Sequence, residues 1–274
     1  MDLTRRKTLI DGAGWGALAL AGLLPASCAK EGGRKDRPSE RDWPPKRPPG
    51  VPKPMVQEDI APVLARLDAW YAAHLPADRY RLNPPASEVA LAAFQRQAGV
   101  RLPRAWHTLY RWHDGENDDR FGHIFGLPLL PIREVEAQWT AWKDVLGGFH
   151  GDRYKVRGGA WPAGAVDPAY INPRWIPLTH DGSGNHIGLD FDPWPKGRIG
   201  QVILFGRDED VKAVVAQSLG GFLERVATLL ETGNYRLRTT PGEAALRRFE
   251  LKRPPTDDFM DGLREIIGAP GPFV

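Results

Sequence analysis

Six polar side chains of the kinds that catalyse reactions or bind metals lie in one short stretch of this chain of 274 residues. Within residues 180–192 they are His180, Asp181, Ser183, His186, Asp190 and Asp192. If the second half of the stretch is a β-strand, then His186, Asp190 and Asp192 share one face, because side chains two positions apart point the same way. Two carboxylates and one imidazole could hold a transition metal or carry out acid–base hydrolysis.

Several features of the stretch weaken the metal-binding and catalytic interpretations. A calcium loop beginning at Asp181 would need a Gly and a distal Glu where His186 and Asp192 stand. Ser183 lies in a turn and lacks the spacing of a nucleophile elbow. Two carboxylates on an open sheet face would also lack the separated pKa values that acid–base catalysis needs. We therefore expect no catalytic residue, no metal and no cofactor, and we interpret the stretch as a solvated polar face whose turn is capped by Asp181 and Asn185.

The elements that position these side chains are three predicted strands. Residues 175–178 and 199–205 are apolar, and residues 186–192 alternate between apolar and polar side chains. The alternation places on the core face Ile187, Leu189 and Phe191. The intervening turns are short and contain Gly, Pro, Asp and Asn, so we expect an antiparallel meander. Its apolar face needs helices, which makes the predicted class α+β, with an antiparallel sheet centred on a meander and packed against several helices.

Apolar residues at three- and four-residue spacing predict the helices. The segments with this pattern or with helix-terminal signals are 58–75, 87–97, 102–110, 135–146, 214–230, 242–251 and 257–267. Ser87 is a suitable N-cap for the second of them, and Gly99 is a suitable residue to end it. Residues 121–132 instead predict a hairpin that turns at Gly126, and residues 147–173 predict a long loop.

The first 28 residues have the layout of an export signal. Arg5 and Arg6 precede a run of Gly, Ala and Leu that is short for a membrane span, which is typical of a twin-arginine signal. Residues 25–28 resemble a lipoprotein box, in which Cys28 would carry the lipid. We expect a lipoprotein of the cell envelope or periplasm that meets the membrane only through this anchor. Cleavage after Ala29, giving a secreted soluble chain, and an uncleaved anchor are the alternatives.

Composition limits the remaining classes of function. Residues 29–57 are rich in Pro, Lys and Arg and predict a stiff basic linker. The net charge of +3 and the pI near 9.0 are too mild to indicate nucleic-acid binding, because the basic residues cluster only near the N-terminus. The single cysteine excludes a disulfide within the chain. No phosphate loop, dinucleotide-binding glycine pattern or His-Glu-x-x-His motif occurs in the sequence.

The central strands resemble the core signature of the SUKH superfamily. An apolar strand with Trp and Pro precedes a Gly-rich turn, then Asp-x-Asp-Pro at 190–193 and Gly-x-x-Gly-Gln-Val-Ile at 197–203. The family's opening is similar to Pro-Ala-Ser-Glu at 85–88, Leu-Pro at 102–103 and His-Asp-Gly at 113–115, and its last helix to residues 214–219. The resemblance implies a SUKH-like domain over 58–236, which leaves 237–274 as a helical extension.

The resemblance also implies a function, since this superfamily contains fungal cell-wall regulators and bacterial immunity proteins. It implies a non-enzymatic protein-binding module of one of these two types. The partner would be a protein, such as a toxin, or a cell-wall component. We place the partner-binding surface on the polar side of the central strands and their turns, at Asp181, Asn185, Asp190, Asp192 and Trp194.

Two alternative functions depend on other subsets of residues. An exported hydrolase would use Asp190 and Asp192 with His186. A glycan-binding envelope protein would use tryptophans in exposed loops, such as Trp161 and Trp194. For most of the ten tryptophans we expect a place in the core.

Overall fold

The computed structural model of the protein describes residues 46–76, 81–117, 122–148, 158–239, 247–256 and 258–273. The predicted export signal with Cys28, and the predicted linker as far as residue 45, lie outside these ranges. No helix in the described ranges has the length and hydropathy needed to span a membrane.

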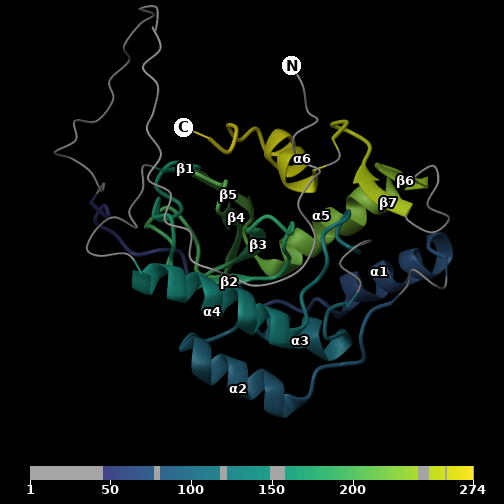
Figure 1. Ribbon diagram of the computed structural model, residues 1–274, viewed down its shortest axis with the longest axis horizontal. Helices are drawn as coiled ribbons and strands as arrows, with labels where there is room; N and C mark the ends of the chain where they lie inside the picture. The colour runs from purple at the N-terminus through teal and green to yellow at the C-terminus, as the bar shows by residue number, and fades with distance from the viewer. Residues whose placement is uncertain are drawn as a thin grey trace, which may run out of the picture. The chain divides into compact units, whose positions relative to one another are not determined.

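A five-stranded sheet, with strand order β1-β5-β4-β3-β2, lies at the centre of the fold (Figure 1). Its strands are β1 (Gly159–Trp161), β2 (Trp175–Pro177), β3 (Asn185–Asp190), β4 (Gln201–Gly206) and β5 (Val211–Ala216). Strands β2 to β5 pair antiparallel in chain order, which confirms the meander, and β1 joins β5 in parallel. A separate hairpin pairs β6 (Tyr235–Thr239) with β7 (Arg247–Leu251).

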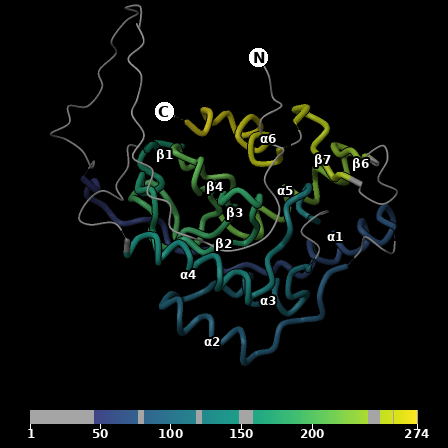
Figure 2. Tube along the Cα trace, in the orientation of Figure 1, coloured from purple at the N-terminus to yellow at the C-terminus, as the bar shows by residue number. Residues whose placement is uncertain are grey.

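Helices pack around this sheet, so the α+β class is confirmed. They are α1 (Ala61–His74), α2 (Glu88–Ala98), α3 (Arg104–Trp112), α4 (Ile132–Gly148), α5 (Leu219–Glu231) and α6 (Phe259–Ile266). Ser87 Oγ accepts a hydrogen bond from the Ala90 amide at the start of α2, and Gly99 ends that helix with a left-handed φ of 63°. Helix α4 runs beside β2, and α6 lies next to β5 (Figure 2).

Two of the predicted helices are strands in whole or in part. The helix predicted over 214–230 is wrong at its start, because Val211–Ala216 pairs with β4 and α5 begins only at Leu219. Valines favour a strand here, and Ser218 Oγ accepts the Gly221 amide to cap α5. The helix predicted over 242–251 is wrong as well, since its second half is β7. The last predicted helix is confirmed as α6.

The hairpin predicted over 121–132 is a tight turn that does not continue as paired strands. Ile124 bridges to Leu127, and Leu129 instead pairs with Thr179, next to β2. The buried carboxylate of Glu116 causes this arrangement, because its Oε1 accepts the amides of both His123 and Leu129. The segment thus closes the open edge of β2.

Both faces of the five-stranded sheet are buried. One face packs on the main core, formed with α1, α3 and α5, and contributes Ile187, Leu189, Val202 and Leu204. The other face carries a smaller cluster, in which Ile203, Phe205 and Val214 contact Ala165 and Val166. The latter two belong to residues 162–174, which we call the covering segment. Consequently every residue of β3 is buried.

Residues 46–58, which we call the strap, bind across one end of the sheet. Arg47 pairs with Asp192 at 2.8 Å, and the Lys53 amide and carbonyl bond to Gly197 and Ile199. At the other end of the strap, the Glu58 carboxylate accepts the Gly220 amide at 2.6 Å, at the start of α5. The described part of the predicted linker is therefore attached to the domain at both ends of the strap.

The C-terminal segment packs into the same core as the rest of the domain. Phe249, Leu251 and Leu263 belong to the main cluster. Arg264 on α6 is buried, forms an ion pair with buried Glu209, and donates to the Val211 carbonyl at 2.6 Å. Burial lowers the pKa of Arg264 to about 10. The guanidinium thus joins α6 to the turn between β4 and β5.

Replacing Arg264 tests this junction. We expect Arg264→Ala to lower the free energy of unfolding by about 3–5 kcal/mol, because it leaves the Glu209 carboxylate buried without its partner. Urea denaturation measures the change. Arg248→Ala, at an exposed position of β7, is the control and should change stability by less than about 0.5 kcal/mol. Equal effects of the two variants would contradict the packing of α6 described above.

Candidate functional site

The predicted partner-binding residues separate into two groups at opposite ends of β3. At the first end, Asp181 accepts the amides of Ser183 and Asn185 at 2.7 and 2.9 Å and the Asn185 side chain at 2.7 Å. Asn185 Oδ1 in turn accepts the Asp208 amide at 2.8 Å. This group holds together the β2–β3 turn and the β4–β5 turn, as predicted for the capping role of Asp181 and Asn185.

At the second end, Asp190 and Asp192 form a carboxylate cluster with Asp167. Asp190 is fully buried, and it accepts Gln201 Nε2 and the Asp192 amide, both at 2.9 Å. Burial, together with the nearby charges of Asp192 and Asp167, raises the pKa of Asp190 to about 7. Burial likewise raises the pKa of Asp167.

Two neighbouring side chains bind the outer carboxylates of this cluster. Arg47 of the strap donates to Asp192 Oδ1 at 2.8 Å and to the Pro193 carbonyl at 2.6 Å. Asn172 Nδ2 donates to Asp192 at 3.1 Å and to Asp167 at 3.4 Å. The cluster thus ties the strap and the covering segment to the end of β3.

The prediction of a solvated polar face on β3 is wrong. Asp190 has no exposed surface, because the covering segment packs on the face that carries it. Asn185, at the start of β3, is 7% exposed and bonds to Asp181 and Asp208. Asp181, Asp192 and Trp194 are half-buried, so only these three keep surface that a partner could touch. The expectation that the two carboxylates share one ordinary environment is also wrong, since burial raises the pKa of Asp190.

His186 is buried and uses both ring nitrogens away from the carboxylates. Its Nδ1 donates to the Thr179 carbonyl at 2.9 Å, and its Nε2 accepts Trp142 Nε1 at 2.9 Å. Burial lowers the pKa of His186 to about 4, so the ring is neutral at pH 7. Among the described residues, no three His, Cys, Asp or Glu side chains are placed to hold a metal ion.

A buried lysine lies on the face of the sheet that also carries His186 and Asp190. Lys212 of β5 is 1% exposed, and its Nζ donates to the Glu209 carbonyl at 2.5 Å. The ring centroids of Tyr170 and Trp175 lie within 6 Å of Nζ, at 5.8 and 5.9 Å. Burial lowers the pKa of Lys212 to about 8. The strand pattern did not reveal this group, because the sequence does not show what covers the second face.

Of the tryptophans proposed for glycan binding, Trp161 is 39% exposed at the end of β1 and Trp194 is half-buried. Two other tryptophans, Trp139 and Trp142, lie on α4. Trp139 is 4% exposed and donates to the Pro173 carbonyl, while Trp142 bonds to His186. Both therefore help to hold the covering segment and the sheet.

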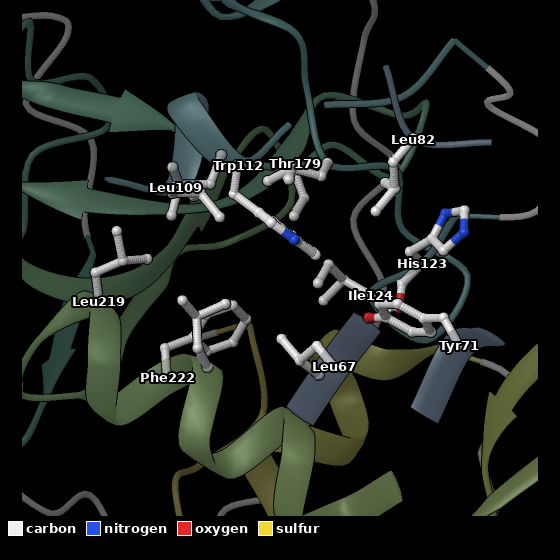
Figure 3. Close-up of a pocket in the computed structure, with 13 residues that line it drawn as sticks. Leu67, Tyr71, Leu82, Leu109, Trp112, His123, Ile124, Thr179, Leu219 and Phe222 are labelled. Carbon is white, nitrogen blue, oxygen red and sulfur yellow. Dashed lines mark hydrogen bonds between the residues drawn. The ribbon is translucent and has the colours of Figure 1, made fainter. Parts of the chain in front are cut away.

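Two interior cavities are too small for a ligand. The first has about 10 Å³ of free space and lies among apolar side chains of α1, α3 and α5, including Leu67, Leu109 and Phe222 (Figure 3). The second, of about 10 Å³, lies among Trp139, Trp142 and Tyr170. Each has room for about one water molecule at most.

A third concavity is open to solvent and much larger. It has about 400 Å³ of free space between α2 and α3, and we call it the α2–α3 groove. Its lining is made of polar and basic side chains over an apolar floor: Gln57, Glu88, Leu91, Ala92, Gln95, Arg101, Leu102, Arg104, His107 and Arg111. The apolar positions used to predict the helices gave no indication of this groove. The available signal was the arginines at 101, 104 and 111, spaced so that they gather beside one helix face.

The central sheet, its meander and the surrounding helices together define a SUKH-type domain, as the sequence signature implied. More particularly, the model of the SMI1/KNR4 family (SUKH-1) matches residues 85–225, slightly more than half of the chain. The chain belongs to the SMI1/KNR4 family. The match leaves out the strap, α1, the β6–β7 hairpin and α6.

Curated relatives are fungal regulators. The chain is 30% identical over 203 residues to the cell wall assembly regulator SMI1 of Saccharomyces cerevisiae, covering 62% of this chain and 40% of that protein. It is 36% identical over 182 residues to the cell wall biosynthesis/cell cycle regulator smi1 of Schizosaccharomyces pombe, covering 62% of this chain and 36% of that protein. It is 31% identical over 226 residues to the glucan synthesis regulatory protein of Neurospora crassa, covering 71% and 42%. The chain spans about two fifths of the length of these relatives.

These relatives overturn the predicted location. The expectation of an envelope or periplasmic lipoprotein is wrong, because the matching proteins are named as fungal regulators of wall assembly and glucan synthesis. Of the two functions that the superfamily implies, the names of these relatives match the regulator.

The buried carboxyl of Asp190 makes stability depend on pH. The folded state holds this proton until about pH 7, whereas the unfolded chain releases it near pH 3.8, so rising pH favours unfolding between these values. We expect Asp190 to cost about 3 kcal/mol of stability between pH 4.5 and pH 7.5. Urea denaturation of the wild type and Asp190→Asn at both pH values measures this difference.

In Asp190→Asn, the part of the pH dependence of stability that comes from Asp190 should disappear. Asn places an amide group near Gln201 Nε2, but the resulting loss of stability is the same at both pH values and cancels in the difference. An identical pH dependence in the two proteins would show that Asp190 ionises in the fold as it does in the unfolded chain.

Proposed function

We propose that this chain is a non-enzymatic regulatory module that controls cell-wall synthesis by binding a protein partner. The observation that carries the proposal is the similarity to named wall and glucan-synthesis regulators over 62–71% of the chain. We assign the module to residues 58–236 together with the C-terminal segment, because Phe249 and Leu263 share its main core.

The interior of the domain supports a binding role over a catalytic one. The two enclosed cavities among the described residues have room for about one water each, so neither can take a small substrate. The polar groups once considered for catalysis are engaged in structure: Asp190 with Gln201, and His186 with Trp142 and Thr179. Recognition by such a domain takes place on its outer surface.

The predicted partner-binding residues contribute to this surface only in part. Asp181, Asp192 and Trp194 keep exposed surface on the turns at the two ends of β3. We propose that these turns form a secondary contact with the partner. Asp190 and Asn185 would act indirectly, by fixing the turns that carry the exposed residues.

Genetic replacement in yeast tests the proposed function. We expect the full chain, placed in Saccharomyces cerevisiae in exchange for the matching region of its SMI1 regulator, to restore wall integrity to cells that lack the regulator. Survival during digestion by a wall-degrading glucanase is the measurement. We expect His186→Gln to restore survival as well as the wild type does at equal protein level, because binding does not need the imidazole to react.

Two controls make the result decisive. Trp106→Ala removes a fully buried side chain, which costs about 3–5 kcal/mol, and should abolish rescue through loss of folded protein. Failure of the folded wild-type chain to restore survival would argue against a regulator function. A folded His186→Gln protein that cannot restore survival would favour chemistry at that residue.

A further inference from the structure

The α2–α3 groove is the described concavity that is large enough and open enough to receive part of another protein. Its volume of about 400 Å³ contrasts with about 10 Å³ in each enclosed cavity. The two walls are neighbouring helices that pack on the rest of the domain, α2 on α4 and α3 on α1 and α5 (Figure 1). A site built on packed helices keeps its shape, so a partner does not have to order it.

The groove carries unneutralised positive charge. Arg101 and Arg104 are exposed, and neither side chain has an ion pair or hydrogen bond among the interactions of the described residues. Arg111 is paired with the only acidic residue of the lining, Glu88. Burial lowers the pKa of His107, and the charge of Arg111 lowers it further, which disfavours a charge on the imidazole. Two free arginines therefore set the charge of the groove at neutral pH.

The groove already contains one carboxylate bound by an arginine. Arg111 Nε and Nη2 donate to the two oxygens of Glu88 at 2.5 and 2.8 Å, in a bidentate contact between α3 and α2. This planar arrangement matches guanidinium to carboxylate geometry. Glu88 thus shows that a carboxylate can reach the groove and bind there in the geometry that arginine prefers.

Side chains of the lining bond to the backbone that carries the free arginines. Gln57 Oε1 accepts the Arg104 amide at 3.4 Å, and Gln95 Oε1 accepts the Leu102 amide at 3.2 Å, beside Arg101. The floor beneath them is apolar, since Leu91 is 1% exposed and Leu102 is 4% exposed. Val89, the residue after Glu88 on α2, is 77% exposed. The surface therefore combines two unpaired cations with a small apolar area nearby.

We propose that the α2–α3 groove binds an acidic segment of a protein partner, whose carboxylates pair with Arg101 and Arg104 while an apolar side chain packs near Val89. This inference rests on the proposed function and names the chemistry of the partner. A nucleic acid fits less well, because proteins that bind it often neutralise about 6–10 phosphates and the groove offers two free arginines.

A peptide-binding experiment with the full chain tests the inference. The probe is a fluorescein-labelled peptide of four Glu-Ala-Leu-Glu repeats, and its control is the peptide with every Glu replaced by Gln. Fluorescence anisotropy gives the dissociation constants. We expect the acidic peptide to bind and the Gln peptide to bind at least about tenfold more weakly, with a difference that shrinks as salt is added.

Charge reversal locates the binding surface. We expect Arg101→Glu/Arg104→Glu to weaken binding of the acidic peptide by about tenfold or more, since each exposed pair contributes up to about fivefold and reversal adds repulsion. Arg248→Glu/Lys252→Glu is the matched control, with the same change in net charge at exposed positions of β7 and the residue after it. It should weaken binding by less than about threefold. Circular dichroism checks that both variants fold.

The outcomes separate the groove from the proposed function. Equal weakening by the two double variants would mean that only net charge matters, and would overturn the groove as the site. The proposal of an acidic partner would also be overturned if the Gln peptide, a phosphorylated peptide or a DNA duplex bound more tightly than the acidic peptide. If the groove variant binds the peptide normally but the wild-type chain rescues yeast, the regulator function stands and this docking site does not. If the groove variant fails to rescue yeast while the wild type and the control variant succeed, the result supports both the regulator function and the groove as its docking site.

Discussion

One buried side-chain amide, that of Gln201, determines how the sheet is covered. Its Nε2 donates to the Ala165 carbonyl and to Asp190 Oδ2, both at 2.9 Å, and its Oε1 accepts the Arg198 amide at 3.0 Å. These partners belong to the covering segment, to β3 and to the turn before β4. Buried polar groups need such partners, and each one left unsatisfied costs about 1–3 kcal/mol. The amide therefore holds the covering segment against the sheet at the point where the carboxylate cluster begins.

Because the second face is closed, the recognition that we propose would use the surface of the helices. A sheet with one open face can present its strands to a partner, as the alternating pattern of β3 suggested. Here that face is filled by Ile203, Phe205 and Val214 against the covering segment, and only its turns reach solvent. Arg101, in the connection between α2 and α3, and Arg104 and Arg111, on α3, instead line a groove whose floor already belongs to the core. Membership of a family of wall regulators fits a domain that binds with its surface and keeps its interior closed.

Local signals in the sequence were sufficient for much of the fold. The alternation of Ile187, Leu189 and Phe191 identified the face of β3 that meets the main core, and Ser87 and Gly99 marked the ends of α2 because caps depend on nearby residues. Residues 214–216 were misassigned because a short valine-rich run fits a strand as well as the first turn of a helix. These residues form a strand because they pair with β4, and a local sequence pattern does not predict that pairing.

The candidate site was harder to predict than the fold for a related reason. Strand alternation correctly separates Asp190 from Leu189, but it does not say what lies over either face. Burial of Asp190 depends on Ala165 and Gln201, and the partner of Asp192 is Arg47, which is 145 positions away. The groove was not predicted, because arginines in and just before a helix look ordinary until α2 packs beside them and forms the second wall.

The strap has a mechanical consequence for the domain. It is fixed at Arg47 to the end of β3, at Lys53 to the turn before β4, and at Glu58 to the start of α5. A force pulling on residue 46 would have to break the contacts of Arg47, Lys53 and Glu58 in turn before it acted on α1 and the core. A force applied from the N-terminal side would thus break polar contacts of the strap first, while the packing of the hydrophobic core stayed intact.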